Sequence, residues 1–249
     1  TQFQRFVSGQ LKNKPASRKP RPIHFNCWEA VYFEHSLERL KNLAQTAAEL
    51  GAERFVLDDG WFGKRNSDRT SLGDWNVNCE KYPIGLSPLI DHIKNLGLEF
   101  GLWFEPEMVN PKSDLFINHP DWILGLPNQN LGRNQLVLDL SKSEVIDYLY
   151  NCINEILLQY DVDYIKWDHN RVLPIVEAKQ TYGLYELLAR LNSSYPKLEI
   201  ESCSSGGGRM DFGILDYTQR LWLSDSNDAI ERMQIQNASA MFFPPSVIG

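Results

Sequence analysis

The sequence predicts an α/β fold, a (β/α)8 TIM-type barrel. Short apolar, β-rich runs alternate with helix-like stretches along almost all of the 249 residues. Successive strand ends are mostly about 25 to 45 residues apart, which is the size of a βα unit. Counting every such run gives eight strands. An open Rossmann-type sheet, the main alternative, needs a glycine-rich turn after its first strand, and the sequence has none at that place.

Each expected strand is a short run of apolar residues that ends in polar residues. In order, these runs occupy 23–26, 54–57, 98–104, 135–138, 164–167, 198–201, 219–223 and a last one that starts at 241–243. The glycine cluster at 206–208 follows a late strand and lacks the Lys-Ser/Thr of a phosphate-binding loop. Taken alone, this cluster indicates a tight turn.

Helices are expected between the strands, where apolar residues recur with a helical period. The expected ranges are 36–50, 87–97, a long helix opened at 141, 184–191 and 229–238. Gly51 stops the first of these, and Ser87-Pro88 indicates an N-cap and first helical residue. Ser141 and Glu144 have the spacing of a capping box.

The two ends of the sequence predict a catalytic barrel without its surroundings. Residues 1–20 are polar and rich in Pro and Lys, so we expect a linker there and the barrel over 21–249. The sequence stops inside or just after the expected eighth strand, which leaves out the closing helix. We therefore expect a piece of a larger polypeptide.

Composition excludes several classes of function. The net charge of −7 disfavours a nucleic acid partner, and no run of about 18 apolar residues could span a membrane. The polar N-terminus predicts no signal peptide. The four cysteines are scattered, and the five histidines form no HExxH pattern. We therefore expect free thiols in a reducing, cytoplasmic setting and no metal or cofactor.

Carboxylates mark the ends of the expected strands. They are Asp58 and Asp59, Glu105, Asp139, Asp168 and Asp225. In a barrel the C-terminal strand ends form one rim, where active sites lie. Tryptophans beside these carboxylates suit the apolar face of a sugar ring, while the carboxylates accept bonds from its hydroxyls. The combination suggests glycoside hydrolysis by a carboxylate pair.

Several motifs resemble glycoside hydrolase family 36 α-galactosidases. They are Asn-Cys-Trp-Glu-Ala at 26–30, Leu-Asp-Asp-Gly-Trp-Phe-Gly at 57–63, Leu-Gly-Asp-Trp at 72–75, Gly-Leu-Trp-Phe-Glu-Pro-Glu at 101–107, Gly-Arg-Asn-Gln at 132–135, Lys-Trp-Asp-His-Asn-Arg at 166–171, Ser-Cys-Ser-Ser-Gly-Gly-Gly-Arg at 202–209 and Ser-Asp-Ser-Asn-Asp-Ala-Ile-Glu-Arg at 224–232. The resemblance runs in order from about residue 21 to residue 249, and together the motifs are highly specific.

The resemblance implies a retaining mechanism through a covalent glycosyl-enzyme. Asp168 matches the nucleophile, and Asp225 matches the general acid/base, with Asp228 as a neighbour. The sugar-binding positions implied are Trp28, Asp58, Asp59, Trp103, Arg133, Lys166, Cys203 and Gly206. Larger members carry a β-domain on each side of the barrel, and the full-length protein could form a homo-oligomer.

The residues themselves agree with these roles. Lys166 and Asp168 are two apart on a strand, so they face the same side. Lys166 and Arg133 would lower the pKa of Asp168 and favour its ionised form. Asp58 and Asp59 reach one ligand only if the chain turns there. The sequence departs from the family pattern at Cys27, at His169 and at Ser226-Asn227.

The leading interpretation is a hydrolase of terminal α-galactosides such as melibiose or raffinose-type sugars. The alternatives are an α-N-acetylgalactosaminidase, a galactosyl transferase of the raffinose-synthase kind, and a non-catalytic sugar-binding barrel. The resemblance places Cys203 and the glycines after it against the 2-hydroxyl of the sugar. Such a surface leaves little room for an N-acetyl group, so galactose should be preferred.

Overall fold

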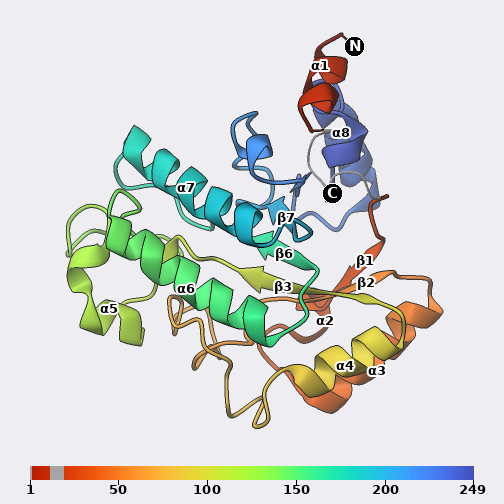
Figure 1. Cartoon of the computed structure of the whole chain (residues 1–249), viewed down its shortest axis with the longest axis horizontal. Coiled ribbons are helices and arrows are strands. Elements are labelled where there is room, and N and C mark those ends of the chain that lie inside the picture. Colours follow the sequence, from red (N-terminus) through yellow and green to blue (C-terminus); the bar gives the residue numbers. More distant parts are fainter. Residues whose placement is uncertain (1, 12–19) are drawn as a thin grey trace.

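The computed structural model describes residues 2–11 and 20–249, and its centre is a curled sheet of six parallel strands (Figure 1). The strands are β1 (His24–Asn26), β2 (Arg54–Leu57), β3 (Glu99–Phe104), β6 (Tyr164–Trp167), β7 (Glu199–Ser202) and β8 (Arg220–Leu221). They lie in the order β1-β2-β3-β6-β7-β8. All five neighbouring pairs run parallel, so every strand points its C-terminal end to the same rim.

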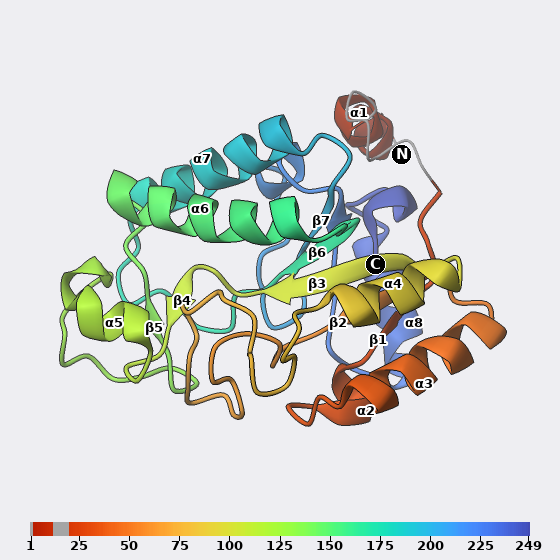
Figure 2. The same cartoon turned by 60° about the horizontal axis from the view of Figure 1, so that its bottom comes forward.

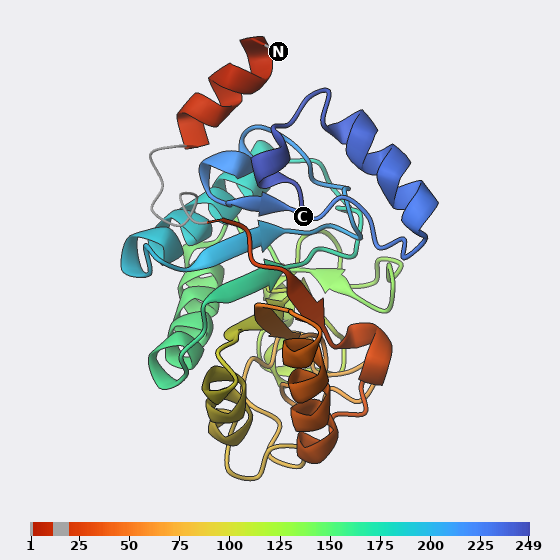
Figure 3. The same cartoon turned by 90° about the vertical axis from the view of Figure 1, so that its right-hand side faces the viewer.

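Helices flank the sheet and the segments around it. They are α1 (Gln2–Leu11), α2 (Trp28–Val31), α3 (Leu37–Glu49), α4 (Ser87–Asn95), α5 (Asp114–Asn118), α6 (Ser143–Gln159), α7 (Ala178–Ser194) and α8 (Ala229–Ser239), with short 3-10 turns at Pro120–Trp122, Ile214–Asp216 and Pro245–Val247. Figures 2 and 3 show α3 and α4 on one flank and α6 and α7 on the other. No helix of the described residues is long and apolar enough to cross a membrane.

The helices bury the faces on which the sequence places its regularly spaced apolar residues. In α6 the buried side chains include Val145, Leu149 and Ile153, which recur at helical spacing. Every residue of β2 is buried, as expected for a parallel strand with side chains packed on both faces. Within β3, a Cβ on Gly101 would lie 2.6 Å from the Tyr164 ring, so glycine makes room for that ring inside the curl.

The expected fourth strand does not enter the main sheet. It is reduced to β5 (Leu136–Val137), which pairs antiparallel with β4 (Met108–Val109). The edge of β3 beside which this strand is expected is occupied, because β6 pairs with β3 there. Residues 105–163 therefore leave the main sheet at the end of β3 and rejoin it at β6.

The expected eighth strand begins later than Met241. The segment after α8 turns back on the helix, since the Phe243 N–H donates to the Ser239 carbonyl, and the Phe243 ring stacks on Phe212. Pairing beside β8 starts only with a parallel bridge between Leu221 and Ile248. The six-stranded curl with outer helices is a partial TIM-type barrel, which confirms the predicted fold class.

Helix starts follow the predicted signals in part. The Ser87-Pro88 pair marks the start of α4, but Ser87 is its first helical residue and not its N-cap, because Leu86 holds the cap position. The side chain of Ser36, for which no cap is predicted, accepts from the Arg39 N–H and caps α3. The capping box at Ser141 is wrong: its hydroxyl donates to the Asp139 carboxylate, and α6 begins at Ser143 instead. The expected linker includes α1, whereas residue 1 and residues 12–19 lie outside the described part of the chain. The boundary at residue 20 stays a prediction.

Candidate active site

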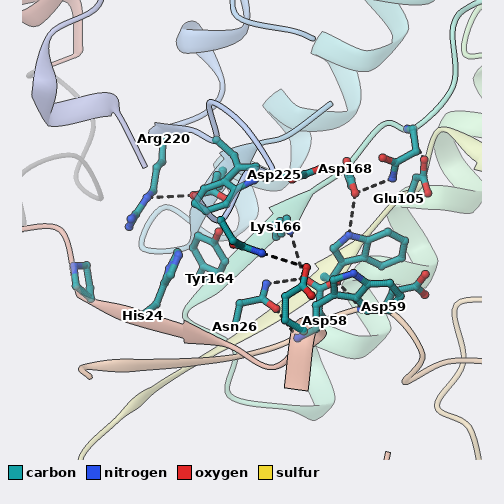
Figure 4. Close-up of a pocket in the computed structure, with 18 of the residues that line it drawn as sticks. His24, Asn26, Asp58, Asp59, Glu105, Tyr164, Lys166, Asp168, Arg220 and Asp225 are labelled. Atoms are coloured by element: carbon teal, nitrogen blue, oxygen red, sulfur yellow. Dashed lines mark hydrogen bonds and ion pairs between the residues drawn. The ribbon is translucent and has the colours of Figure 1, made fainter. Parts of the chain in front are cut away.

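A pocket of about 720 Å³ opens on the concave side of the sheet and extends from the start of β1 to the C-terminal strand ends (Figure 4). Five of the predicted strand-end carboxylates line it, namely Asp58, Asp59, Glu105, Asp168 and Asp225. Asp139 does not, because its strand pairs outside the main sheet and its carboxylate binds the Ser141 N–H and hydroxyl. The rim of the barrel has therefore gathered the acidic groups from four strands.

Asp168 is buried and held by hydrogen bonds to both oxygens. Oδ2 accepts from Trp103 Nε1 at 3.1 Å and from Asn170 Nδ2 at 2.7 Å, and Oδ1 accepts from the His169 N–H at 2.8 Å. Burial alone would raise the pKa of Asp168, but the Lys166 ammonium, followed by hydrogen bonds from Asn170, Cys203 and His169, lowers it below its ordinary value. The carboxylate is ionised and fixed in direction, as a nucleophile requires.

Lys166 is one of the cationic side chains that line the pocket. Its ammonium lies 3.3 Å from Asp58 Oδ2, which also accepts from Asn26 Nδ2 at 2.5 Å. Burial alone would lower the pKa of Lys166, but the carboxylate of Asp58 and further acidic neighbours raise it above its ordinary value. Lys166 therefore keeps its charge beside Asp168 and offers a donor to a bound hydroxyl.

The chain turns at Gly60, so Asp58 and Asp59 both reach the pocket, as predicted. Gly60 has a φ of +115°, in the left-handed region that favours glycine. Asp59 binds Arg65 through both oxygens, at 2.9 and 2.8 Å. Burial is the main cause that raises the pKa of Asp59, and Arg65 opposes it. Arg65 is fixed in turn by Asn110 Oδ1 at 3.0 Å.

Asp225 lines the same pocket as Asp168 (Figure 4). It is exposed, and its Oδ1 accepts from Trp222 Nε1 at 2.7 Å. Asp228, the other acid of the motif, accepts from the N–H groups of Ile230 and Glu231 and caps α8. Asp228 is therefore occupied as a helix cap, while Asp225 is free to meet a ligand.

Glu105 is a third acid beside Asp168. It is buried, with Gln135 Nε2 at 3.1 Å from one oxygen and the Asn170 N–H bound to the other. Burial, and after it the charge of Asp168, raises the pKa of Glu105 to about 8. Gln135 Oε1 has no hydrogen-bond partner among the described residues. Rotation of that amide would let a protonated Glu105 donate to it.

The predicted sugar-binding residues divide into two groups. Those that line the pocket are Trp28, Asp58, Asp59, Trp103, Arg133 and Lys166. Cys203 and Gly206 lie just behind the lining, and Cys203 is buried, with its thiol hydrogen-bonded to Asp168. A Cβ on Gly206 would lie 2.8 Å from Ser224 Cα and 3.2 Å from Asp225 N. Gly206 thus packs against the backbone that carries Asp225.

Sequence reasoning missed other lining residues, among them His24, Asn26, Arg65, Tyr164, Asn170, Glu201, Arg220 and Trp222. Period-two alternation could have found some of them, because Tyr164 precedes Lys166 by two residues on β6. Arg65 carries no such signal, since it reaches the pocket from the irregular segment after β2. No group of three or more His, Cys, Asp or Glu side chains in the described ranges could hold a metal ion.

Comparison with known proteins gives one consistent family. The sequence model of the Melibiase family matches residues 1–249. An α-galactosidase of Escherichia coli is 49% identical over 259 residues and is matched by 100% of this chain. The α-galactosidase AgaA of Geobacillus stearothermophilus is 47% identical over 246 residues, with 93% of this chain covered.

Solved structures agree with the sequence matches. A variant of the GH36 α-galactosidase AgaA solved with stachyose has a TM-score of 0.92 at 42% identity over 99% of this chain. Another variant of AgaA, solved with raffinose, has a TM-score of 0.87 at 45% identity over 94% of the chain. The chain spans about a third of these relatives, 36% of the Escherichia coli protein and 34% of AgaA.

Proposed function

Because the chain belongs to the melibiase family, we propose that it is the catalytic barrel of an α-galactosidase, a glycoside hydrolase that removes terminal α-galactosyl units. The substrates proposed are α-galactosides of the melibiose and raffinose type. Relatives solved with raffinose and with stachyose support that class of sugar. The mixture of aromatic faces and charged acceptors in the pocket supports a sugar as well.

One observation carries the proposal more than any other. Asp168 is buried, its pKa is lowered, and both oxygens are held by N–H donors at the wall of the pocket. A carboxylate that only stabilised the fold would have its partners in the core rather than at a cavity wall. This one faces space that a ligand can enter, and a second carboxylate, Asp225, lines the same pocket.

The proposed reaction is a double displacement. Asp168 attacks the anomeric carbon while Asp225, protonated at the start, gives its proton to the leaving oxygen. Water activated by the Asp225 carboxylate then hydrolyses the galactosyl ester and restores Asp168. The exposure of Asp225 supports this second half, because water and leaving group must both pass it.

Side chains that line the pocket orient the sugar in this proposal. Lys166 and Asp58 form an ion pair that can bind neighbouring hydroxyls of one sugar, one group donating and the other accepting. Trp28 and Trp103 line the same cavity and offer apolar faces. Arg65 holds Asp59 through both oxygens, so the acceptor is fixed before the sugar arrives.

Hydrolysis of p-nitrophenyl α-galactoside by the intact natural protein tests the proposal. We expect activity in the wild type and almost none in Asp168→Asn, because an amide cannot form the glycosyl ester. In Asp225→Ala, azide should restore p-nitrophenol release and yield α-galactosyl azide. Binding of galactose without any turnover would contradict the proposal and favour a sugar-binding barrel. Galactosyl transfer to added sucrose, without hydrolysis, would favour the transferase.

A further inference from the structure

Four polar side chains meet behind the end of β6, on the side away from the pocket. Glu107, which is 2% exposed, accepts from Trp167 Nε1 at 2.9 Å and from Arg209 Nη1 at 2.7 Å. Its other oxygen lies 3.3 Å from His169 Nδ1. None of these four residues lines the pocket, so the proposed reaction makes no direct use of them.

The cluster holds the chain on both sides of Asp168. Trp167 and Asp168 are consecutive on an extended segment, so their side chains point to opposite faces. His169 follows, and its side chain returns to the face of Trp167. Glu107 therefore contacts the residue before Asp168 and the residue after it. The backbone is held as well, since the Asp168 N–H donates to the Phe104 carbonyl at 2.7 Å.

The charge of Glu107 makes these contacts strong. Burial alone would raise its pKa, but Arg209, and after it His169, lowers the pKa well below the ordinary value. Glu107 is thus ionised, and hydrogen bonds to a charged acceptor are stronger than neutral ones. Arg209 follows the loop that carries Gly206, so the same carboxylate joins two walls of the site.

We propose that Glu107 is a positioning residue for Asp168: it holds Trp167 and His169 from behind and so fixes the direction in which the Asp168 carboxylate faces the sugar. The inference rests on the proposed function, in which Asp168 is the nucleophile. A brace that served only stability would lower the melting temperature and leave turnover per folded molecule unchanged. A positioning residue affects the chemical step more than ground-state binding.

The test compares Glu107→Gln with wild type in the intact protein, using p-nitrophenyl α-galactoside. We expect kcat per folded molecule to fall about 100-fold, since a displacement of about 1 Å costs that much. KM and inhibition by galactose should change less than about threefold. Asp163→Asn is the matched control, a carboxylate just before β6 that accepts from Lys94 Nζ at 2.6 Å and from the Phe100 N–H at 2.8 Å and lies outside the pocket. It should melt earlier and keep its kcat. Equal kcat in Glu107→Gln and wild type would overturn the inference.

Two milder variants keep the inference testable if Glu107→Gln fails to fold. Trp167→Phe and His169→Leu each remove one contact and leave the pair of Glu107 with Arg209 intact. Each should lower kcat, and His169→Asn, whose amide can replace Nδ1, should restore it. Unchanged kcat in both Trp167→Phe and His169→Leu would overturn the inference.

A crystal structure separates this inference from the proposed function. In Glu107→Gln, or in Trp167→Phe, we expect the Asp168 carboxylate to lose its bonds to Trp103 and Asn170. An unmoved carboxylate would overturn the positioning role, whether or not the protein is active. Conversely, a wild type that hydrolyses no α-galactoside would overturn the proposed function, and the crystal structures would still decide the role of Glu107.

Discussion

Replacement of Glu105 by Gln should change how the stability of the fold depends on pH. Burial, together with the negative charge of Asp168, raises the pKa of Glu105 from 4.5 to about 8. Between these values the side chain is protonated in the folded protein and ionised in the unfolded chain. The stability that Glu105 contributes is therefore fully present below its unfolded pKa and is lost as the pH rises toward 8.

The magnitude follows from that difference. Each pH unit between the two pKa values corresponds to about 1.4 kcal/mol, so wild type should lose about 3 kcal/mol between about pH 5 and pH 8 through this one group. Glu105→Gln is neutral at every pH and has the same shape. The free energy of unfolding of Glu105→Gln should not fall in this way. Relative to wild type, the variant should therefore become more stable by about 3 kcal/mol over the same pH range.

Urea unfolding of both proteins at the two pH values, followed by tryptophan fluorescence, measures the effect. Glu107→Gln in a His169→Asn background is the control, because the pKa of Glu107 is lowered rather than raised, chiefly by Arg209 acting against burial. In that background no imidazole contacts position 107, so the double variant should differ from His169→Asn by a constant amount over this range. A constant difference for Glu105→Gln as well would refute the reasoning.

Three further predictions concern the reaction. The carboxyl groups of Asp168 and Asp225 should lie roughly 5 to 5.5 Å apart in a galactose complex, with an ångström or two of slack; a separation near about 9 Å would indicate inversion. Gly206→Ala should lower kcat at least about tenfold, because its Cβ would displace the Asp225 backbone; unchanged kcat would show that the loop yields freely. If Cys203 and the glycines after it face the 2-position of the sugar, the kcat/KM of wild type should be much higher for the α-galactoside than for the α-N-acetylgalactosaminide; equal values would show that they do not face it.

Local signals in the sequence predicted much of the fold. The strand at Tyr164–Trp167 has the predicted bounds, and α3 ends before Gly51, as predicted. The predictions from sequence are wrong where two segments compete for the same strand edge or packing partner. Leu136–Val137 is as β-rich as any strand, but β6 occupies the edge that it would have used. Met241 starts an apolar run whose phenylalanine packs on another ring instead.

The candidate site could be predicted because the strand ends can be located in the sequence, and a barrel brings them to one rim. Strand ends converge on one rim, so Asp58 and Lys166 meet although they are distant in sequence. The environment of each acid could not be predicted, because it depends on what packs around it in space. Glu105 and Glu107 are two residues apart, yet burial beside Asp168 raises the pKa of one and Arg209 lowers that of the other.

The excursion from residue 105 to residue 163 has a consequence for how such enzymes diversify. The chain leaves the sheet after β3 and returns at β6, which lies directly beside β3. It reaches the pocket through Glu105, Arg133 and Gln135. Because β3 and β6 pair without it, the part of this arm before α6 that neither lines the pocket nor contacts Trp167 and His169 can change in length or sequence while the strand-end carboxylates keep their places. Arg133 and Gln135 belong to this arm, so one wall of the pocket can vary in evolution separately from the strands that carry Asp58 and Asp168.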